Sequence, residues 1–450
     1  MPERQITTAP HGHLLTNAGV WSPDSRWIVY DTRSSPDGSV FDGTRIERVA
    51  VDSGLVEVLY ESRHGACCGV VTASPVDDRV VFILGPEQPT ADWQYGAARR
   101  QGVVVRTSRP TVIERLDARD LLPPFTPGAL RGGSHVHLFS PDGRLVSFTY
   151  EDAVLDAQPT AASTTHNSSS SGSRQEKNLR GIGVSVCGRP VAVPAGHPRN
   201  HDGTGFTVLV TRLHDEPEPG GDEISRAFEE AWIGTQGYLR PDGSRQRYAL
   251  AFQGQVAVDG GTAADPRTIS EVFVCDLPDD PADLEVAGAD PLAGTVARRP
   301  APPRGVLQRR ITFTACRRHP GIQGQRHWLR SSPDGSRIAF LMKDDAGIVQ
   351  LFTVSPSGGE PRQLTRAPWS IASCFTWSPA GHHIACIADG DVQLVDSAGG
   401  GCTRLTSSAA GPPRPEACVF SPDGRRIAFM RSVADHGGTH NQIFVVDLPE

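Results

Sequence analysis

The chain has 450 residues, a formal net charge of -7 and 38% hydrophobic residues, which is the composition of an ordinary globular protein. Its basic residues, of which only Lys177 and Lys343 are lysines, form no basic run, and this excludes the electrostatic footprint of a nucleic-acid-binding protein. No segment approaches the roughly 20 apolar residues of a membrane span, and the N-terminus lacks the apolar core of a secretory signal, so we expect a cytoplasmic protein with neither a membrane nor a nucleic acid as partner.

One short motif recurs along the chain. An aromatic or small residue precedes Ser-Pro-Asp-Gly, or a close variant of it, and a run of alternating β-forming residues follows. The copies begin at Trp21, Ala73, Phe139, Ser331, Trp377 and Phe420. Proline fixes one turn dihedral, aspartate accepts hydrogen bonds inside the turn, and glycine adopts a positive φ. Each copy therefore predicts a strand, a tight turn and an antiparallel strand.

A second motif follows several of these copies, at Arg45, Leu351 and Val392, and it predicts a third strand, a glycine turn and a fourth strand. Units of four antiparallel strands that return about every 40–50 residues are typical of a β-propeller. The last unit ends after its third strand, in IFVVDLPE, whereas the N-terminus carries the fourth-strand signature ERQIT. We therefore expect 4–7 to pair with 443–447 and to close the ring, which removes the open sheet edge.

The sequence thus predicts one all-β domain over residues 1–450, a seven-bladed propeller of four-stranded antiparallel blades. The predicted blades span 11–61, 62–120, 130–194, 197–315, 326–366, 371–406, and 416–450 together with 1–8. The stretch 197–315 is the most irregular, and a six-bladed ring is the alternative if it holds no complete blade.

Two segments depart from the repeat. Residues 156–178 are rich in Ser and Thr and predict a disordered loop. Residues 222–234 carry apolar side chains at helical spacing, with Asp222 as N-cap and Gly234 as stop, and predict a short helical insertion.

The aromatic-Ser-Pro-Asp-Gly motif, together with sequences such as GGEPRQLT near residue 360, resembles the repeat of TolB and tricorn-type propellers. The whole chain, including PHGHLLTN and PGALRGGSHVHLFSPDG, resembles the YidR-like family of bacterial propellers. This resemblance implies the propeller fold and no activity. Oligogalacturonate lyases are a more distant resemblance, because they also carry a His-x-His before such a turn and hold a divalent metal; His135 and His137 before Phe139 look similar.

The repeat also defines a register for candidate site residues. The residue five positions before each motif serine occupies an equivalent place on the innermost strand of its blade; these residues are Asn17, Gly69, His135, His327, Ser373 and Glu416. His135, His137, His327 and Glu416 are the candidate ligands of a divalent metal, Mn or Zn. Arg131 and Arg326, with Asn17, are the candidate binding residues for a small anion.

Two functions follow from this register. The fold favours a binding module that engages a protein partner or a small anionic ligand at the face of the central channel. The alternative is a metal-dependent lyase or hydrolase that acts on an acidic, sugar-like substrate, as the resemblance to oligogalacturonate lyase implies. A third interpretation stays open at this point, namely that the polar residues at the channel mouth only bind water and fill space.

Overall fold

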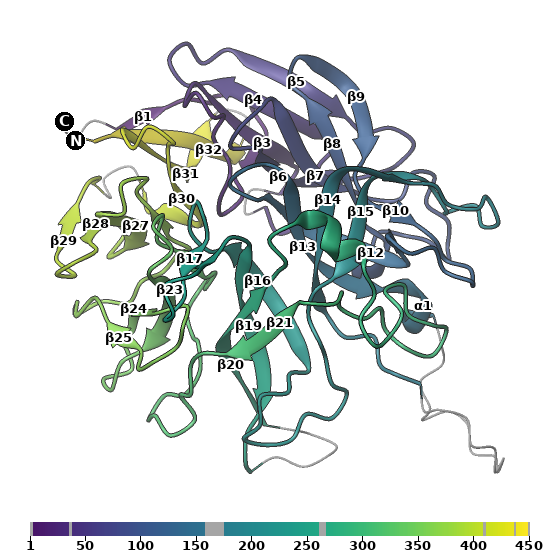
Figure 1. Ribbon diagram of the computed structural model, residues 1–450. Helices are drawn as coiled ribbons and strands as arrows, with labels where there is room; N and C mark the ends of the chain where they lie inside the picture. Colours follow the sequence, from purple (N-terminus) through teal and green to yellow (C-terminus); the bar gives the residue numbers. More distant parts are fainter. Residues whose placement is uncertain are drawn as a thin grey trace.

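The computed structural model of the chain describes residues 3–35, 38–157, 175–260, 267–407, 411–435 and 438–448. These residues form seven four-stranded antiparallel sheets, which stand around one axis as the blades of a β-propeller (Figure 1). The predicted fold is confirmed, and the ring has seven blades rather than six. The Ser/Thr-rich stretch that predicts a disordered loop, 156–178, lies largely outside the described residues.

The first three blades follow the chain from its N-terminal side. Their strands are β2 (Gly12–Leu14), β3 (Trp27–Arg33), β4 (Arg45–Ala50) and β5 (Val56–Glu61); β6 (Cys68–Ala73), β7 (Arg79–Leu84), β8 (Gln101–Arg106) and β9 (Arg109–Arg115); and β12 (Gly132–Phe139), β13 (Leu145–Asp152), β14 (Gly181–Val191) and β15 (Gly203–Leu209).

Blades four to six continue in the same order. Their strands are β16 (Arg226–Trp232), β19 (Ala249–Ala257), β20 (Thr268–Asp276) and β21 (Leu307–Arg310); β22 (Arg330–Ser331), β23 (Ile338–Lys343), β24 (Val349–Val354) and β25 (Arg362–Gln363); and β26 (Thr376–Trp377), β27 (His383–Ala388), β28 (Asp391–Asp396) and β29 (Cys402–Arg404).

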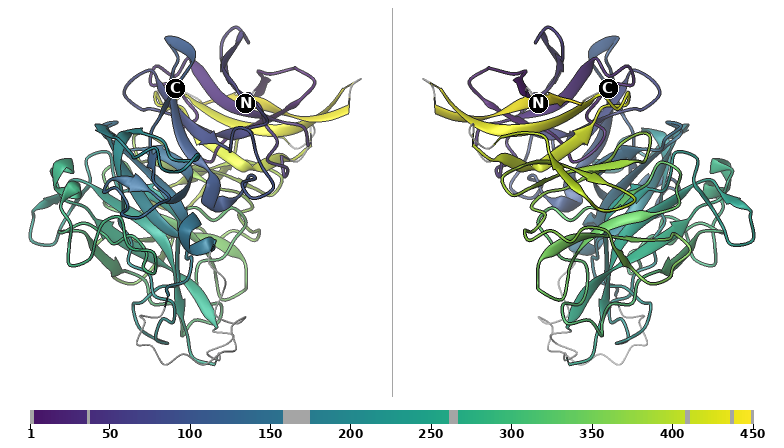
Figure 2. Two further views of the ribbon diagram at one scale, coloured as in Figure 1. Left: turned by 90° about the vertical axis from the view of Figure 1, so that its right-hand side faces the viewer. Right: turned by 90° about the vertical axis from the view of Figure 1, so that its left-hand side faces the viewer.

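The seventh blade joins the two ends of the chain. It contains β30 (Pro413–Phe420), β31 (Arg426–Asp435) and β32 (Gly438–Asp447), and β1 (Glu3–Gln5) pairs with β32 as its outermost strand. Arg4 lies opposite Val445, within the predicted register, and the Thr7 hydroxyl donates a hydrogen bond to Gln442 Oε1 at 2.8 Å. In the side views the yellow strands of this blade lie beside the purple strands of the first (Figure 2). The predicted closure of the ring is therefore confirmed.

The recurring turn has the expected hydrogen bonds. In the third blade the Ser140 hydroxyl donates to Asp142 at 2.7 Å and accepts from the Leu145 backbone amide at 3.0 Å, while Gly143 adopts a φ of 68°. A side chain at Gly143 would be strained in that conformation. The sequence motif thus encodes the connection between the first and second strands of a blade.

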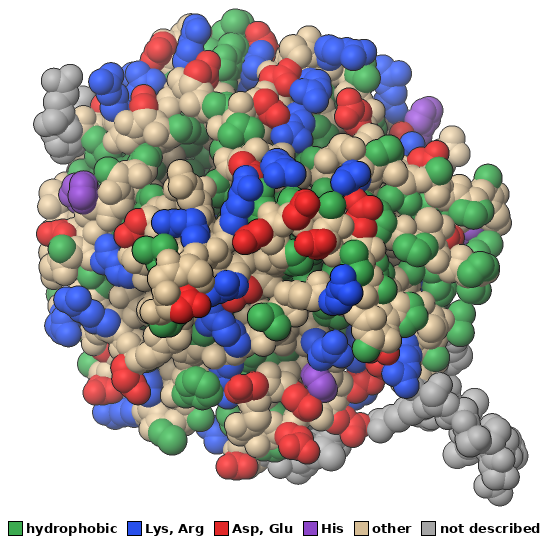
Figure 3. All heavy atoms as spheres, viewed as in Figure 1, with side chains coloured by type: hydrophobic (Ala, Val, Ile, Leu, Met, Phe, Trp, Pro, Cys, Tyr) green, Lys and Arg blue, Asp and Glu red, His purple; other side chains and the backbone are tan. Residues whose placement is uncertain are grey.

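The hydrophobic core is divided among the spaces between neighbouring blades. Ile182 and Val184 of β14, for example, share one buried cluster with Phe252 of β19 and Phe273 of β20. Inner strands such as β23 and β27 are buried along most of their length because neighbouring blades cover both of their faces, whereas outermost strands such as β9 and β29 are largely exposed. On the face seen in Figure 3, acidic and basic side chains are interspersed.

The remaining elements are short connections. They are the helical turns η1 (Ala97–Arg99), α1 (Ala153–Asp156) and η3 (Pro281–Glu285), the parallel pair β10 (Ala118–Arg119) and β11 (Ala129–Leu130), and the hairpin β17 (Tyr238–Leu239) and β18 (Arg245–Gln246). Within the described ranges, no helix has the length and apolar character that crossing a bilayer requires.

The helix predicted over 222–234 is wrong. This segment contains β16, the innermost strand of the fourth blade, which pairs with β19. A bulge between Phe228 and Ala231 shifts the register, so the buried residues are Ala227, Glu230 and Ala231. Their spacing of three and four residues imitates a helix, although a bulge in a strand produces it. The sequence 201–213, which we assigned to the fourth blade, instead contains β15, the outermost strand of the third.

Candidate functional site

The innermost strands begin at one end of the ring axis, which we call the entry face. His135 lies in the first half of β12, half-buried at this face. Residues two apart share one side of a regular strand, but a bulge separates His135 from His137, and Val136 between them has a φ of 56°. The His137 ring is fully buried between blades, 5.8 Å from the Phe148 ring between centroids, and burial lowers its pKa to about 3. The two histidines therefore do not converge.

The predicted residues of blades five and seven are held by other partners. His327 Nε2 lies 3.7 Å from a carboxylate oxygen of Glu229. Arg326 lies 3.4 Å and Arg414 3.0 Å from the same oxygen of Glu416. The Glu416 carboxylate is therefore neutralised by arginines and lies away from His135 in the ring order.

These placements do not assemble the predicted metal ligands. Among the residues that the structure describes, no three His, Cys, Asp or Glu side chains are grouped so that they could hold a metal ion. His135, His137, His327 and Glu416 come from three blades, and one of them is turned into the core. The donor set that the sequence suggests for Mn or Zn does not fit such an ion, and we derive no chemistry through one.

The predicted anion-binding residues Asn17 and Arg131 are buried, and their polar atoms already contact other groups of the protein. Asn17 Oδ1 accepts a short hydrogen bond from Arg330, which crosses from blade five to blade one. The Arg131 guanidinium is 1% exposed; it lies 2.6 Å from Asp152 and donates to the Arg298 carbonyl at 2.7 Å and to the Thr295 carbonyl. Arg131 thus anchors the 294–299 loop to the third blade.

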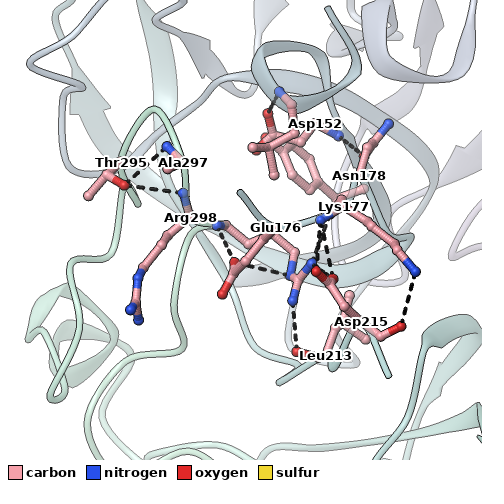
Figure 4. Close-up of polar contacts among 12 residues, drawn as sticks. Asp152, Glu176, Lys177, Asn178, Leu213, Asp215, Thr295, Ala297 and Arg298 are labelled. Carbon is pink, nitrogen blue, oxygen red and sulfur yellow. Dashed lines mark hydrogen bonds and ion pairs between the residues drawn. The ribbon is translucent and has the colours of Figure 1, made fainter. Parts of the chain in front are cut away.

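Polar contacts around Glu176 and Asp215 continue from that anchor on the flank of blades three and four (Figure 4). Arg299 lies 2.5 Å from Asp215, and its backbone amide donates to Glu176 at 2.7 Å. We call the set Arg131, Asp152, Glu176, Asp215 and Arg299 the flank network. Each of its two arginines pairs with at least one of its three carboxylates, and these contacts hold the segment that follows residue 174 against the 294–299 loop.

A different set of arginines surrounds His135 at the entry face. Arg33 ends β3, Arg100 precedes β8, Arg180 precedes β14, and Arg226 begins β16. We call these four residues the arginine arc. They come from four successive blades, and each lies at the strand end that faces the entry face.

Close backbone contact places Arg100 beside β12. A Cβ atom on Gly133 would lie 2.7 Å from the Arg99 backbone nitrogen, so only glycine lets β12 approach η1 so closely. Arg119 strengthens the contact, because its guanidinium donates to the Gly132 carbonyl at 3.3 Å and to the Arg100 carbonyl. Arg100 therefore lies next to the strand that carries His135.

Glycine also makes room for Arg33. Gly69 occupies in blade two the position that His135 occupies in blade three, and a Cβ there would lie 2.7 Å from Asp31 Oδ2 and 2.9 Å from Arg33 Nη2. Arg33 and Asp31 form a buried ion pair of 2.5 Å in that space. The space that a side chain at position 69 of blade two would fill is thus taken by Arg33 of blade one.

Two aromatic rings link Arg33 to Arg100. The Arg33 guanidinium lies 4.3 Å from the centre of the Phe41 ring, Phe41 stacks on Tyr95 at 4.5 Å, and Arg100 lies 5.1 Å from the Tyr95 ring. Cation–π contacts of this kind hold a guanidinium in place without neutralising its charge.

The arginine arc differs from the flank network in how many of its arginines form ion pairs with carboxylates. Arg180 forms an ion pair of 2.5 Å with Glu151, as Arg33 does with Asp31. Arg100 and Arg226 form no ion pair with any carboxylate in the described ranges, and the buried Nε of Arg100 has no hydrogen-bond partner there. Tyr95 is a hydrogen-bond partner of the Arg100 side chain, and Glu151 and Glu229 act on Arg226 from beyond ion-pair distance. Arg100 and Arg226 are therefore the two members of the arc without an ion-paired carboxylate.

The electrostatics agree with this geometry. Burial, and then the charges of Arg100 and Arg180, hold the pKa of His135 well below its usual range, so the imidazole is neutral at pH 7. Burial lowers the pKa of the Arg100 guanidinium as well. The arginine arc is thus a cationic cluster in a chain whose net charge is -7.

None of the four arginines of the arc, Arg33, Arg100, Arg180 and Arg226, was predicted from the sequence. The register selected residues on innermost strands, whereas Arg33, Arg100 and Arg180 belong to or precede the second and third strands. Glu229, which lies between Arg226 and His327, was hidden by the helix prediction. The sequence feature that could have identified these residues is an arginine beside the end of a predicted strand in each of the first four blades.

Comparison with known proteins shows the family to which the chain belongs. Residues 67–201 match the model of a family described as "Protein of unknown function (DUF3748)". The uncharacterized protein YidR of Escherichia coli (strain K12) is 44% identical over 428 residues, which are 95% of this chain and 94% of that protein.

Solved structures share the fold. An oligogalacturonate lyase in complex with manganese is similar with a TM-score of 0.53 and 13% identity, over 100% of this chain and 93% of the other. A putative TolB from Agrobacterium tumefaciens has a TM-score of 0.38 and 14% identity, over 99% and 94%. At 13% identity the likeness to the lyase shows the propeller architecture alone.

Proposed function

The chain belongs to the YidR family of β-propellers, and from that premise we propose that it is a binding protein whose arginine arc receives a small anionic ligand at the entry face. The observation that carries the proposal is the pair of unmatched guanidinium groups, Arg100 and Arg226, on either side of the paired Arg180. Arginines that only support a fold are matched by carboxylates or carbonyls, as Arg131 is.

The exposure of the arc suits a ligand that comes from solution. Arg226 is exposed, Arg100 and His135 are half-buried, and Arg33 is buried. An anion would therefore reach Arg226 and Arg100 first. The planar guanidinium group binds carboxylate, sulfate and phosphate oxygens through paired hydrogen bonds, so these are the groups that we expect on the ligand.

One observation favours a catalytic variant of this proposal. A neutral imidazole beside arginines is arranged to accept a proton from a bound acid, which is the requirement of a lyase acting on an acidic sugar-like substrate. An oligogalacturonate lyase with manganese is among the proteins of similar fold. A divalent metal, Mn or Zn, stays a prediction for this chain, and elemental analysis of the purified protein tests it. An unidentified protein partner also stays a prediction.

The test of the proposal is a binding measurement with simple anions. We expect sulfate, phosphate and galacturonate to raise the melting temperature of the wild-type protein in a dose-dependent manner at constant ionic strength. Arg100→Gln and Arg226→Gln should weaken each effect by about tenfold in concentration, as loss of one charge-assisted contact implies. Arg425→Gln is the matched control, because Arg425 is exposed on the turn of blade seven. Equal responses in all four proteins would refute the proposal.

A further inference from the structure

A pocket of about 680 Å³ lies between blades three and four, at the end of the ring axis opposite the entry face. The innermost strands end there, and the pocket is lined by the motif turn of blade three, by Trp232 at the end of β16 and by residues that follow it. Sites for small molecules have volumes of this order. The arginine arc lies at the other end of the strands, so this pocket is a separate candidate site.

The pocket exists because the fourth blade departs from the repeat. In blade six, Trp377 before the motif serine pairs with Ile384 across the short motif turn. Trp232 holds the equivalent place in blade four, but it pairs with Leu250, and the hairpin β17–β18 occupies the added length. An insertion in one unit of a repeat places new side chains at one face of the ring, which is where binding residues are commonly found.

The insertion is held in place by hydrogen bonds to blade five and to its own blade. The Thr235 backbone amide and hydroxyl donate to the Pro333 carbonyl at 2.8 Å and 3.0 Å. The buried Gln246 side chain donates to the carbonyls of Tyr248 and Leu277, both at 2.7 Å. A wall fixed in this way forms the pocket before a ligand arrives, and a preformed site loses less conformational entropy on binding.

Trp232 keeps the anchor of its motif position but lacks the usual cover. Its indole nitrogen donates to a backbone carbonyl of the preceding blade at 3.0 Å, as that of Trp377 does at 3.1 Å. Trp377 is 8% exposed, and the Arg337 guanidinium lies 4.9 Å from the centre of one of its rings. Leu145 takes the place of that arginine in blade three. Trp232 is therefore only half-buried, and within the described ranges no arginine lies over its indole.

Charged side chains of both signs line the remainder of the pocket. Arg247 lies 3.2 Å from Asp142. Arg245 is exposed, and its guanidinium donates to the Gln236 carbonyl at 3.3 Å. Asp279 is exposed as well, and it accepts a hydrogen bond from the Arg247 backbone amide at 3.3 Å. Because the lining arginines and aspartates balance, the pocket has no net charge that would attract an ion.

We propose that this pocket binds the ring of a neutral sugar, which stacks on the indole of Trp232 and bonds through its hydroxyl groups to Arg245 and Asp279. One face of a pyranose ring carries C–H groups and packs on an aromatic face, where it buries apolar surface. Each hydroxyl group both donates and accepts hydrogen bonds, so one sugar can satisfy a guanidinium and a carboxylate together. A nucleotide or an acidic sugar would bring a negative charge that the balanced pocket does not match.

The experiment measures saturation-transfer difference NMR of the full-length protein with the methyl glycosides of glucose, galactose, mannose and N-acetylglucosamine. We expect at least one of them to bind with a dissociation constant on the order of 1 mM, because so small a ligand makes few contacts. Trp232→Leu should abolish the signal. Arg245→Gln and Asp279→Ala should each weaken binding by about tenfold, because each removes a charge-assisted hydrogen bond.

Two control variants match these substitutions. Trp377→Leu removes a tryptophan from the same motif position in a blade without the pocket, and it should bind the glycoside as the wild type does. Arg425→Gln removes an exposed arginine from the motif turn of blade seven and should also leave binding unchanged. The exposed positions Arg245 and Asp279 keep the test decisive even if Trp232→Leu does not fold.

Three results would overturn the proposal. The first is a wild-type protein that gives no signal with any of the four glycosides up to about 50 mM, well above the expected dissociation constant. The second is a signal that all the pocket variants retain. The third is binding of sulfate in place of the glycosides, lost in Arg245→Gln, which would make the pocket an anion site. Glycoside binding should persist in an Arg100→Gln, Arg226→Gln double variant, so this proposal and that for the arginine arc stand or fall separately.

Discussion

The arginine arc and the flank network are built from the same residue type and lie on neighbouring blades, but they differ in how their charges are matched. In the flank network Arg131 and Arg299 each contact at least one carboxylate and at least one backbone carbonyl. In the arc Arg100 and Arg226 contact aromatic rings and, within the described ranges, no carboxylate.

The comparison shows that the position of an arginine in the repeat does not reveal its role. Arg131 lies four residues before His135 on the same segment of chain and was a reasonable candidate for an anion site. The structure turns it into the flank, where all of its surroundings are protein. The distinction between a structural and a binding arginine lies in its partners, and these come from distant parts of the sequence.

The largest expected effect is on stability, and it comes from a substitution that breaks the flank network. Arg131→Met removes one partner of a buried ion pair and leaves Asp152 charged and unpaired, which should lower the free energy of unfolding by about 3–5 kcal/mol. Urea denaturation followed by circular dichroism measures it. A loss below about 1 kcal/mol would show that the network contributes little and would remove the contrast with the arc.

The second effect concerns pH. His137 has a folded-state pKa of about 3, below the ordinary value near 6.5, so the unfolded state binds more protons as the pH falls below that value. Stability is therefore lost between about pH 6.5 and pH 3, at up to about 1.4 kcal/mol for each pH unit. In His137→Gln this slope should be smaller than in the wild type, when both are followed by thermal unfolding across that range. An unchanged slope would assign acid sensitivity to other groups.

A smaller effect, on anion affinity, is expected when the carboxylate that pairs with Arg180 is removed from the arc. Glu151→Gln removes the partner of Arg180 and adds an unmatched guanidinium group, which should raise the affinity for sulfate by about two- to fivefold, as expected for a partly exposed ion pair. Glu61→Gln is the matched control, because Glu61 pairs with Arg45 on an exposed strand. Titration calorimetry of both variants gives the answer, and equal affinities would place the anion elsewhere.

The smallest effect is on stability. Arg100→Gln should change the free energy of unfolding by no more than about 0.5 kcal/mol, because the guanidinium forms no ion pair that the substitution would break and is opposed by the charge of Arg180. Chemical denaturation beside Arg131→Met measures the difference. A loss as large as that of Arg131→Met would make Arg100 a structural residue.

The fold was predictable because its signals are local. The turn around Ser140 and Asp142 recurs with the same hydrogen bonds, and the β1 signature at the N-terminus completes the last blade. The bulges were not predictable, because a bulge is a response to packing between blades and changes no residue type. One bulge at Val136 separated His135 from His137, and another at Glu229 gave a strand the spacing of a helix. The site was therefore found only in part: His135 was foreseen, and the arginines around it required the ring to be assembled.

The most direct test of the account is a crystal of the wild-type protein soaked in selenate, an anion whose selenium atom can be located by anomalous scattering. The account predicts a strong anomalous peak at the entry face, within hydrogen-bond distance of Arg100 or Arg226 and close to His135, and no such peak in an Arg100→Gln, Arg226→Gln double variant. Selenate bound only at other surface arginines, with the arc open to solvent and empty in the wild-type crystal, would contradict it.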